Sequence, residues 1–145
     1  MSLRLLAVNT ARLEFELGDG QTGEPDSAPA SLQVIPQPQD NDGLLQFKIH
    51  FVIAPETAQN QMMFRFHIDL FASYAIDGDL EGVDLEAFGL STALADSFPF
   101  LREIVLSTTA ASGIAPWVLP VPAREAVDSQ LHAATGSTGG DLSKD

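Results

Sequence analysis

The chain is organised around residues 98–122, FPFLREIVLSTTAASGIAPWVLPVP. Pro99 predicts the first turn of a helix, because proline lacks the N–H that this turn leaves unbonded and disfavours helical geometry in the residue before it. Gly113 predicts the end of that helix. The apolar run at residues 114–122 contains three prolines, so it predicts an extended surface connector and not a buried strand. An apolar connector at the surface indicates a site that binds another molecule.

Three segments before this stretch alternate apolar and polar residues with the period of a half-buried strand. They cover residues 11–17, 45–53 and 62–70, and a shorter extended segment at 32–36 ends in a proline that is typical of a sheet edge. Residues 18–30 are rich in Gly, Pro, Asp and Ser and predict a loop. Strands with one polar face form an antiparallel sheet whose other face needs a cover.

Helices later in the chain are expected to supply that cover. Asp84 is the predicted N-cap of a helix that runs to about residue 95, a second helix starts at Pro99, and a third is predicted at residues 123–134. Residues 135–145 are rich in Gly, Ser and Thr and predict a disordered tail. Strands followed by helices indicate one α+β domain, residues 1–134, with the helices on one face of the sheet.

Composition narrows the class of partner. Seven basic and twenty acidic residues give a net charge of −13, which argues against duplex nucleic acid or an anionic membrane. The absence of cysteine excludes disulfides and thiolate metal sites and agrees with a reducing compartment. Residues 1–9 contain too short an apolar run for a signal peptide or a membrane span, so we expect a cytoplasmic protein.

Few residues offer catalytic chemistry. His50 and His67 occupy the polar faces of successive predicted strands and could be neighbours, and with Asp69 they could bind a metal or transfer protons. We interpret them instead as exposed polar positions, because no further ligand has the spacing of a known site. The acidic residues at 77–86 lack the spacing of an EF-hand. We therefore expect neither an enzyme nor a bound metal or cofactor.

Several short motifs, taken together and in order, resemble the SecB family of bacterial protein-export chaperones. Residues 74–78 resemble the family's aromatic-x-Ile-x-Gly signature, and residues 98–103 its Phe-Pro-Tyr-x-Arg-Glu helix start. Residues 113–122 are similar to its Gly-x-x-Pro-x-Leu segment leading to a second proline, and residues 13–16 to part of its first strand. Order and spacing agree over residues 3–127.

The resemblance implies a four-stranded antiparallel sheet with two main helices packed on one face, assembled as a dimer or a dimer of dimers. Family members hold unfolded preproteins in long apolar grooves without ATP and pass them to the motor SecA. An apolar surface with flexible methionines suits such binding, because it accepts extended chains with little sequence preference. The predicted peptide-binding residues are Met62, Met63, Phe71, Tyr74, Ile114, Trp117, Val118 and Leu119. The alternative is that Trp117, Val118 and Leu119 fold back onto the core.

The sequence also departs from the family pattern. Phe100 replaces the tyrosine of the helix start, and Ala123 and Arg124 stand where Asn-Phe is usual. Glu16 matches one acidic residue of the family's SecA-docking face, but Arg12 and His67 take the positions of others. Three functions therefore stay open: a holdase for exported preproteins, a SecB-like chaperone dedicated to a client such as an antitoxin, and a non-chaperone oligomeric adaptor or scaffold.

Overall fold

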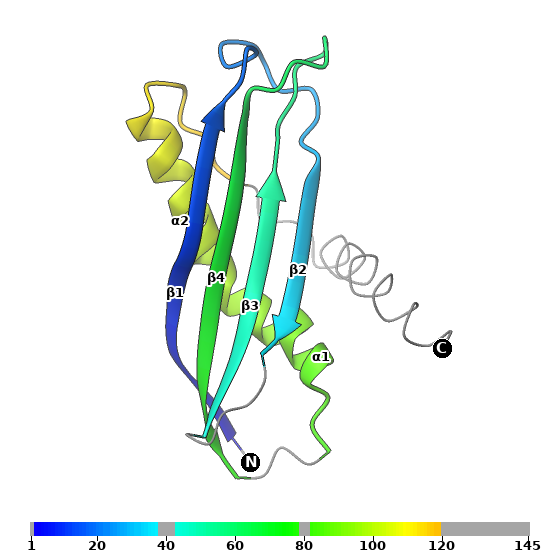
Figure 1. Ribbon diagram of the computed structural model, residues 1–145, viewed down its shortest axis with the longest axis vertical. Coiled ribbons are helices and arrows are strands. Elements are labelled where there is room, and N and C mark those ends of the chain that lie inside the picture. The colour runs from blue at the N-terminus through cyan, green and yellow to red at the C-terminus, as the bar shows by residue number, and fades with distance from the viewer. Residues whose placement is uncertain (1, 38–42, 79–81, 120–145) are drawn as a thin grey trace, which may run out of the picture.

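The fold is a four-stranded antiparallel sheet with one long helical segment across one face (Figure 1). The computed structural model describes residues 2–37, 43–78 and 82–119. The strand order in the sheet is β1-β4-β3-β2. The strands are β1 (Ser2–Leu17), β2 (Ala30–Pro36), β3 (Leu44–Ile53) and β4 (Phe64–Asp77), and the helical elements are α1 (Leu85–Phe88), the π-helix η1 (Gly89–Ala93) and α2 (Leu94–Ala111).

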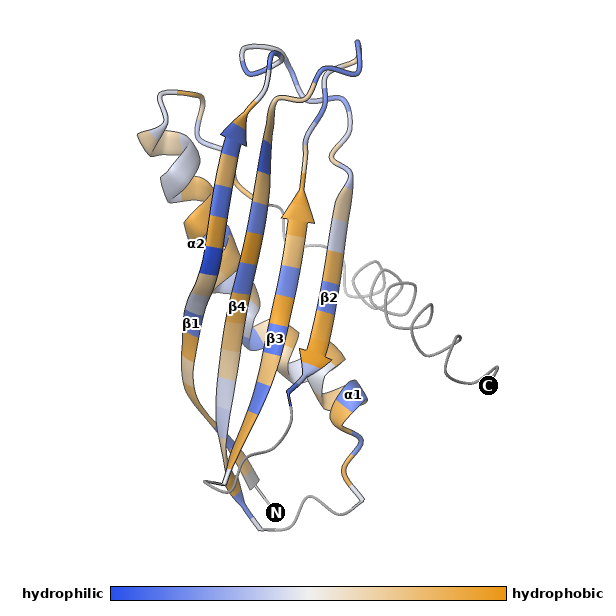
Figure 2. Cartoon of the chain, in the orientation of Figure 1, coloured by the Kyte–Doolittle hydropathy of each residue, from blue (hydrophilic) through white to orange (hydrophobic). Residues whose placement is uncertain are grey.

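The two central strands confirm the predicted alternation. Along β3 every second side chain, from Leu45 to Ile53, is buried, and the side chains between them are half-buried on the opposite face. Figure 2 shows the same alternation as bands of apolar and polar residues along β3 and β4. The apolar face packs under the helical segment and the polar face is open. The segment at residues 32–36 is part of β2, which is an edge strand as predicted.

Strand β1 is longer than residues 11–17, the strand predicted from the sequence. It pairs with β4 from Ser2 to Leu17, with register shifts between Leu5 and Ala7 and between Thr10 and Arg12. Each shift inserts one extra residue, and this breaks the period of two on which the prediction depended. The strand is also less buried than its pattern predicted.

The predicted pair of separate helices is wrong. The backbone stays helical from residue 85 to residue 111, because α1, η1 and α2 follow one another without a break. Asp84 is the N-cap as predicted, since its side chain accepts a hydrogen bond of 3.1 Å from the amide of Ala87. Pro99 lies inside α2 instead of starting a helix, so its missing N–H leaves the carbonyl of Ala95 without its usual partner.

The helical segment crosses the sheet diagonally. In Figure 1 it runs behind the strands, from α1 near β2 to the end of α2 beside β1, and the contacts of α1 with β2 and of α2 with β4 and β1 agree with this path. Leu94, Leu101 and Val105 form its buried stripe. This packing buries apolar surface of the central strands, which is the main source of stability for such a layer.

The helix ends where the sequence predicted. Its last residue is Ala111, and Gly113 follows with φ of 80°, a left-handed conformation that glycine adopts without strain. The chain then continues without helix or strand to Leu119. The predicted third helix, the predicted tail and the end of the connector lie outside the described residues.

Candidate functional site

The connector returns to the sheet through Trp117. The Trp117 ring meets the ring of Phe64 edge-on, with 5.6 Å between centroids. Phe64 in turn lies 6.0 Å from Phe15, and Phe15 lies 4.7 Å from Phe66. Edge-on and tilted contacts at these distances are favourable for aromatic rings. The four rings join β1, β4 and the connector on the helix-covered face.

A buried threonine holds this part of the connector in place. Thr109 is fully buried near the end of α2, and its hydroxyl oxygen accepts a hydrogen bond of 2.9 Å from the backbone amide of Trp117. The same hydroxyl donates to the carbonyl of Val105 at 2.8 Å. The first bond fixes the connector to the helix eight residues earlier in the chain.

Exposed apolar side chains lie next to the aromatic cluster, in β1 and in the connector. Leu13 and Leu17 of β1 are 45% and 42% exposed, and Val118 of the connector is 51% exposed. Leu17 pairs with Phe64 in the sheet register. Leu13 points to the same face of the sheet as Leu17, because the two residues are four apart in β1 and both register shifts come before them. We call Leu13, Phe15, Leu17, Trp117 and Val118 the apolar surface. Its two leucines were missed as binding residues, because their alternation in the sequence indicated only burial.

The structure brings together only some of the predicted peptide-binding residues. Ile114 and Trp117 are half-buried against the core, Val118 is exposed, and Leu119 is buried. Met62, in the loop before β4, is half-buried. The connector therefore packs on the core through Trp117 and Leu119 and exposes Val118. Packing on the core, the alternative to peptide binding, thus describes Leu119 but not Val118.

Three predicted residues lie elsewhere. Met63 is buried in the core, and Tyr74 is only 1% exposed. Phe71 lies on the open face of the sheet, because it alternates with the buried Leu70 and Ala72 of β4. Met63 and Tyr74 can thus support the helix-covered face from within, whereas Phe71 points away from Trp117.

Tyr74 ties the sheet to α2. Its hydroxyl donates a hydrogen bond of 2.7 Å to the Asp96 carboxylate. Burial raises the pKa of Tyr74 above its ordinary value of 10.0, and the hydrogen bond to Asp96 and the negative charge of that residue raise it further. Tyr74 is therefore a neutral hydrogen-bond donor at physiological pH.

The open face carries charges of both signs. Glu16, the predicted partner-docking residue, is exposed and forms an ion pair of 2.8 Å with Arg65. Glu14 forms an ion pair of 2.9 Å with Arg12. The two acids at this end of β1 are therefore each matched by an arginine, and the area is not a uniformly acidic docking face.

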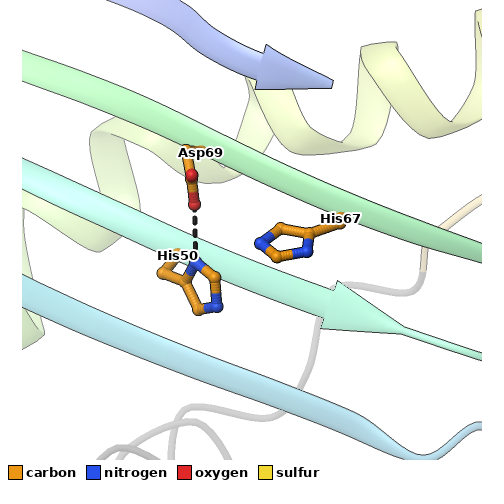
Figure 3. A group of neighbouring side chains, drawn as sticks. All are labelled: His50, His67 and Asp69. Atoms are coloured by element: carbon orange, nitrogen blue, oxygen red, sulfur yellow. Dashed lines mark hydrogen bonds and ion pairs between the residues drawn. The ribbon is translucent and has the colours of Figure 1, made fainter. Parts of the chain in front are cut away.

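His50 and His67 are neighbours on this open face, as the sequence suggested they could be. His50 on β3 pairs with Asp69 on β4 in the sheet register, and His67 lies two residues before Asp69 in β4. The two imidazole centroids are 4.6 Å apart (Figure 3).

Comparison with known proteins supports the fold by structure and not by sequence. No family model matches the chain, and no curated protein matches its sequence. Among solved structures, the chain is similar to the SecB-like chaperone Rv1957 of Mycobacterium tuberculosis, solved in complex with a ChAD peptide from the Rv1956 HigA1 antitoxin. The TM-score is 0.64 at 16% identity, over 83% of this chain and 90% of that one. A protein of unknown function from Streptococcus agalactiae matches with a TM-score of 0.41 at 11% identity, over 83% of this chain and 98% of that one.

The likeness to the mycobacterial chaperone shows that the chain has a SecB-like fold. The four-stranded antiparallel sheet and the long helix across it match the architecture of the mycobacterial chaperone. Within residues 2–37, 43–78 and 82–119, no helix is long and apolar enough to cross a membrane.

Proposed function

We propose that this protein is a cytoplasmic, ATP-independent holdase that binds unfolded polypeptides. The observation that carries the proposal is the apolar surface, on which Leu13, Leu17 and Val118 stay exposed around the half-buried Trp117. Contiguous exposed apolar side chains mark interaction sites, since water contact with them is unfavourable unless a partner covers them. The likeness of the fold to a chaperone bound to a client peptide supports the same function.

We further propose that the chain self-associates through β1. Within the described part of the chain, no strand pairs with the outer edge of β1, and Leu5, Leu6, Leu13 and Leu17 along it are exposed. A long edge strand with exposed leucines is a template for pairing with another chain unless it is covered. A second copy of the same chain, paired along the first half of β1, would cover Leu5 and Leu6 and leave Leu13 and Leu17 open to a client.

The next question is which polypeptide the protein binds and whether it passes that polypeptide on to SecA. A dedicated client such as an antitoxin is favoured by the likeness of the fold to the mycobacterial chaperone, which was solved in complex with an antitoxin peptide. Delivery of preproteins to SecA is the other possibility. It has less support, because Glu14 and Glu16 are each paired with an arginine and offer little unmatched negative charge.

Suppression of aggregation tests the proposal. The purified chain at stoichiometric amounts is expected to slow the aggregation of a chemically unfolded model protein, measured by light scattering without ATP. Trp117→Ala should weaken this protection. Ile35→Ala is the matched control, because Ile35 is an exposed apolar side chain whose register partner, Lys48, lies on the open face. If the wild-type chain gives no protection, the holdase function is wrong.

The rival function is an oligomeric scaffold that uses the same apolar residues only for its own assembly. It predicts a stable oligomer that does not protect the unfolded protein, and in which Trp117→Ala changes only the oligomeric state. Measuring mass by analytical ultracentrifugation beside the scattering assay separates the two functions.

A further inference from the structure

The open face of the sheet gathers three side chains that bind metals in other proteins. His50 on β3 and His67 and Asp69 on β4 each offer a ligand atom, and these atoms lie within 4.8 Å of one another. Figure 3 shows the two imidazole rings and the carboxylate converging on one small region between the strands. The strands fix this convergence, because His50 stands opposite Asp69 in the register.

The environment of the His67 imidazole indicates that this place can hold a bound ion. Its Nε2 atom is buried and has no hydrogen-bond partner. Burying an imidazole nitrogen without a partner costs folding free energy, because the atom loses its hydrogen bond to water and forms no other bond in its place. The other nitrogen, Nδ1, lies 3.9 Å from the Glu14 carboxylate, which favours placing the ring proton on Nδ1. That tautomer leaves a free lone pair on Nε2.

We propose that His50, His67 and Asp69 form a binding site for a first-row transition-metal dication such as Zn²⁺. Two imidazoles and one carboxylate suit Zn²⁺, Ni²⁺ or Cu²⁺ better than Ca²⁺ or Mg²⁺, which prefer oxygen ligands alone. Bonds of about 2.0–2.2 Å to Zn²⁺ place tetrahedral ligands roughly 3.4 Å apart. Small side-chain rotations therefore bring the three ligand atoms from their present spacing to the metal.

The surroundings of the three side chains limit the affinity of the site. Asp69 is buried, and its Oδ1 atom lies 2.6 Å from His50 Nδ1. A metal ion would replace this hydrogen bond, with the His50 ring proton on Nε2 and the Nδ1 lone pair on the metal. Lys48 Nζ lies 3.9 Å from the other Asp69 oxygen, and its positive charge opposes a dication. This side chain is partly exposed and can turn into solvent. His50 and His67 are each about a quarter exposed, at 25% and 23% of the side chain, so water can supply the remaining ligands of the ion.

The test is calorimetric titration of the full chain with ZnCl2 in a non-chelating buffer, after dialysis against EDTA. One equivalent of Zn²⁺ is expected to bind saturably. His50→Gln and His67→Gln should each weaken binding by more than about tenfold, and Glu14→Gln should weaken it less, because Glu14 only orients His67. His132→Gln is the matched control, since it removes the third histidine of the chain and should leave binding unchanged.

Two outcomes would overturn the proposal: a wild-type chain without saturable binding, or binding that is lost only in His132→Gln. Should a variant not fold by circular dichroism, histidine NMR signals of the wild-type chain decide. Two of the three imidazoles must shift with the first equivalent of Zn²⁺, and a shift of one imidazole or none contradicts the site. The site is independent of the holdase function, since none of its residues belongs to the apolar surface.

Discussion

Thr109→Val tests whether the hydrogen bond from Trp117 holds the connector on the protein. Valine keeps the shape of threonine but removes the oxygen that accepts the Trp117 amide at 2.9 Å. If water replaces that oxygen, the free energy of unfolding should fall by about 1 kcal/mol, and if the amide stays buried without a partner, by up to about 3 kcal/mol. For a chain of this size the melting temperature should fall by roughly 2–10 °C.

The fluorescence of Trp117 reports whether the connector leaves the protein, because Trp117 is the only tryptophan in the chain. In Thr109→Val the emission should shift to longer wavelength and iodide should quench it more, as the connector leaves the Phe64 ring. Thr109→Ser is the control, since it keeps the hydroxyl and loses only a methyl group, at a cost of about 1 kcal/mol. Unchanged emission and an unchanged urea midpoint in Thr109→Val, at equal protein concentration, would refute the proposed anchor.

Two further predictions concern the pH dependence of stability and self-association. Folding raises the pKa of Tyr74 above 10.0 and so favours its neutral form; this stabilisation is complete below pH 10 and is lost as the pH rises above it. Tyr74→Phe, which removes the hydrogen bond to Asp96, should lower stability to urea at pH 7 by about 1.5–3 kcal/mol and flatten the alkaline loss; an alkaline loss equal to that of the wild type would contradict this. Leu5→Arg with Leu6→Arg should convert an oligomer into folded monomers in analytical ultracentrifugation while Ile35→Arg does not, and an unchanged mass would exclude pairing through β1.

The sheet could be predicted in large part from the sequence. Strands β3 and β4 alternate over most of their length, and a period of two over so many residues indicates a strand. The position of Phe71 was also readable, since it follows the odd-numbered polar residues of β4 and not the even-numbered apolar ones. The start of β1 could not be predicted from the sequence, because the extra residues at the two register shifts break the alternation of apolar and polar side chains.

The course of the helical segment could not be predicted from local sequence preferences alone. Pro99 predicts a helix start, but the buried contacts of Leu94 and Leu101 on either side of it outweigh the loss of one backbone hydrogen bond. The role of Thr109 gives no signal in the sequence, since its hydroxyl contacts a residue whose position depends on the turn at Gly113. The exposure of Leu13 and Leu17 likewise depends on how far the diagonal helix reaches over β1.

The most direct measurement of the proposed function is the emission of Trp117 while an unfolded polypeptide that lacks tryptophan is added to the full chain. If the apolar surface binds clients, the emission should shift saturably, and the same titration of Leu17→Arg should give a weaker response. An emission spectrum that does not change at any client concentration, in a chain that is folded by circular dichroism, would contradict client binding at this surface.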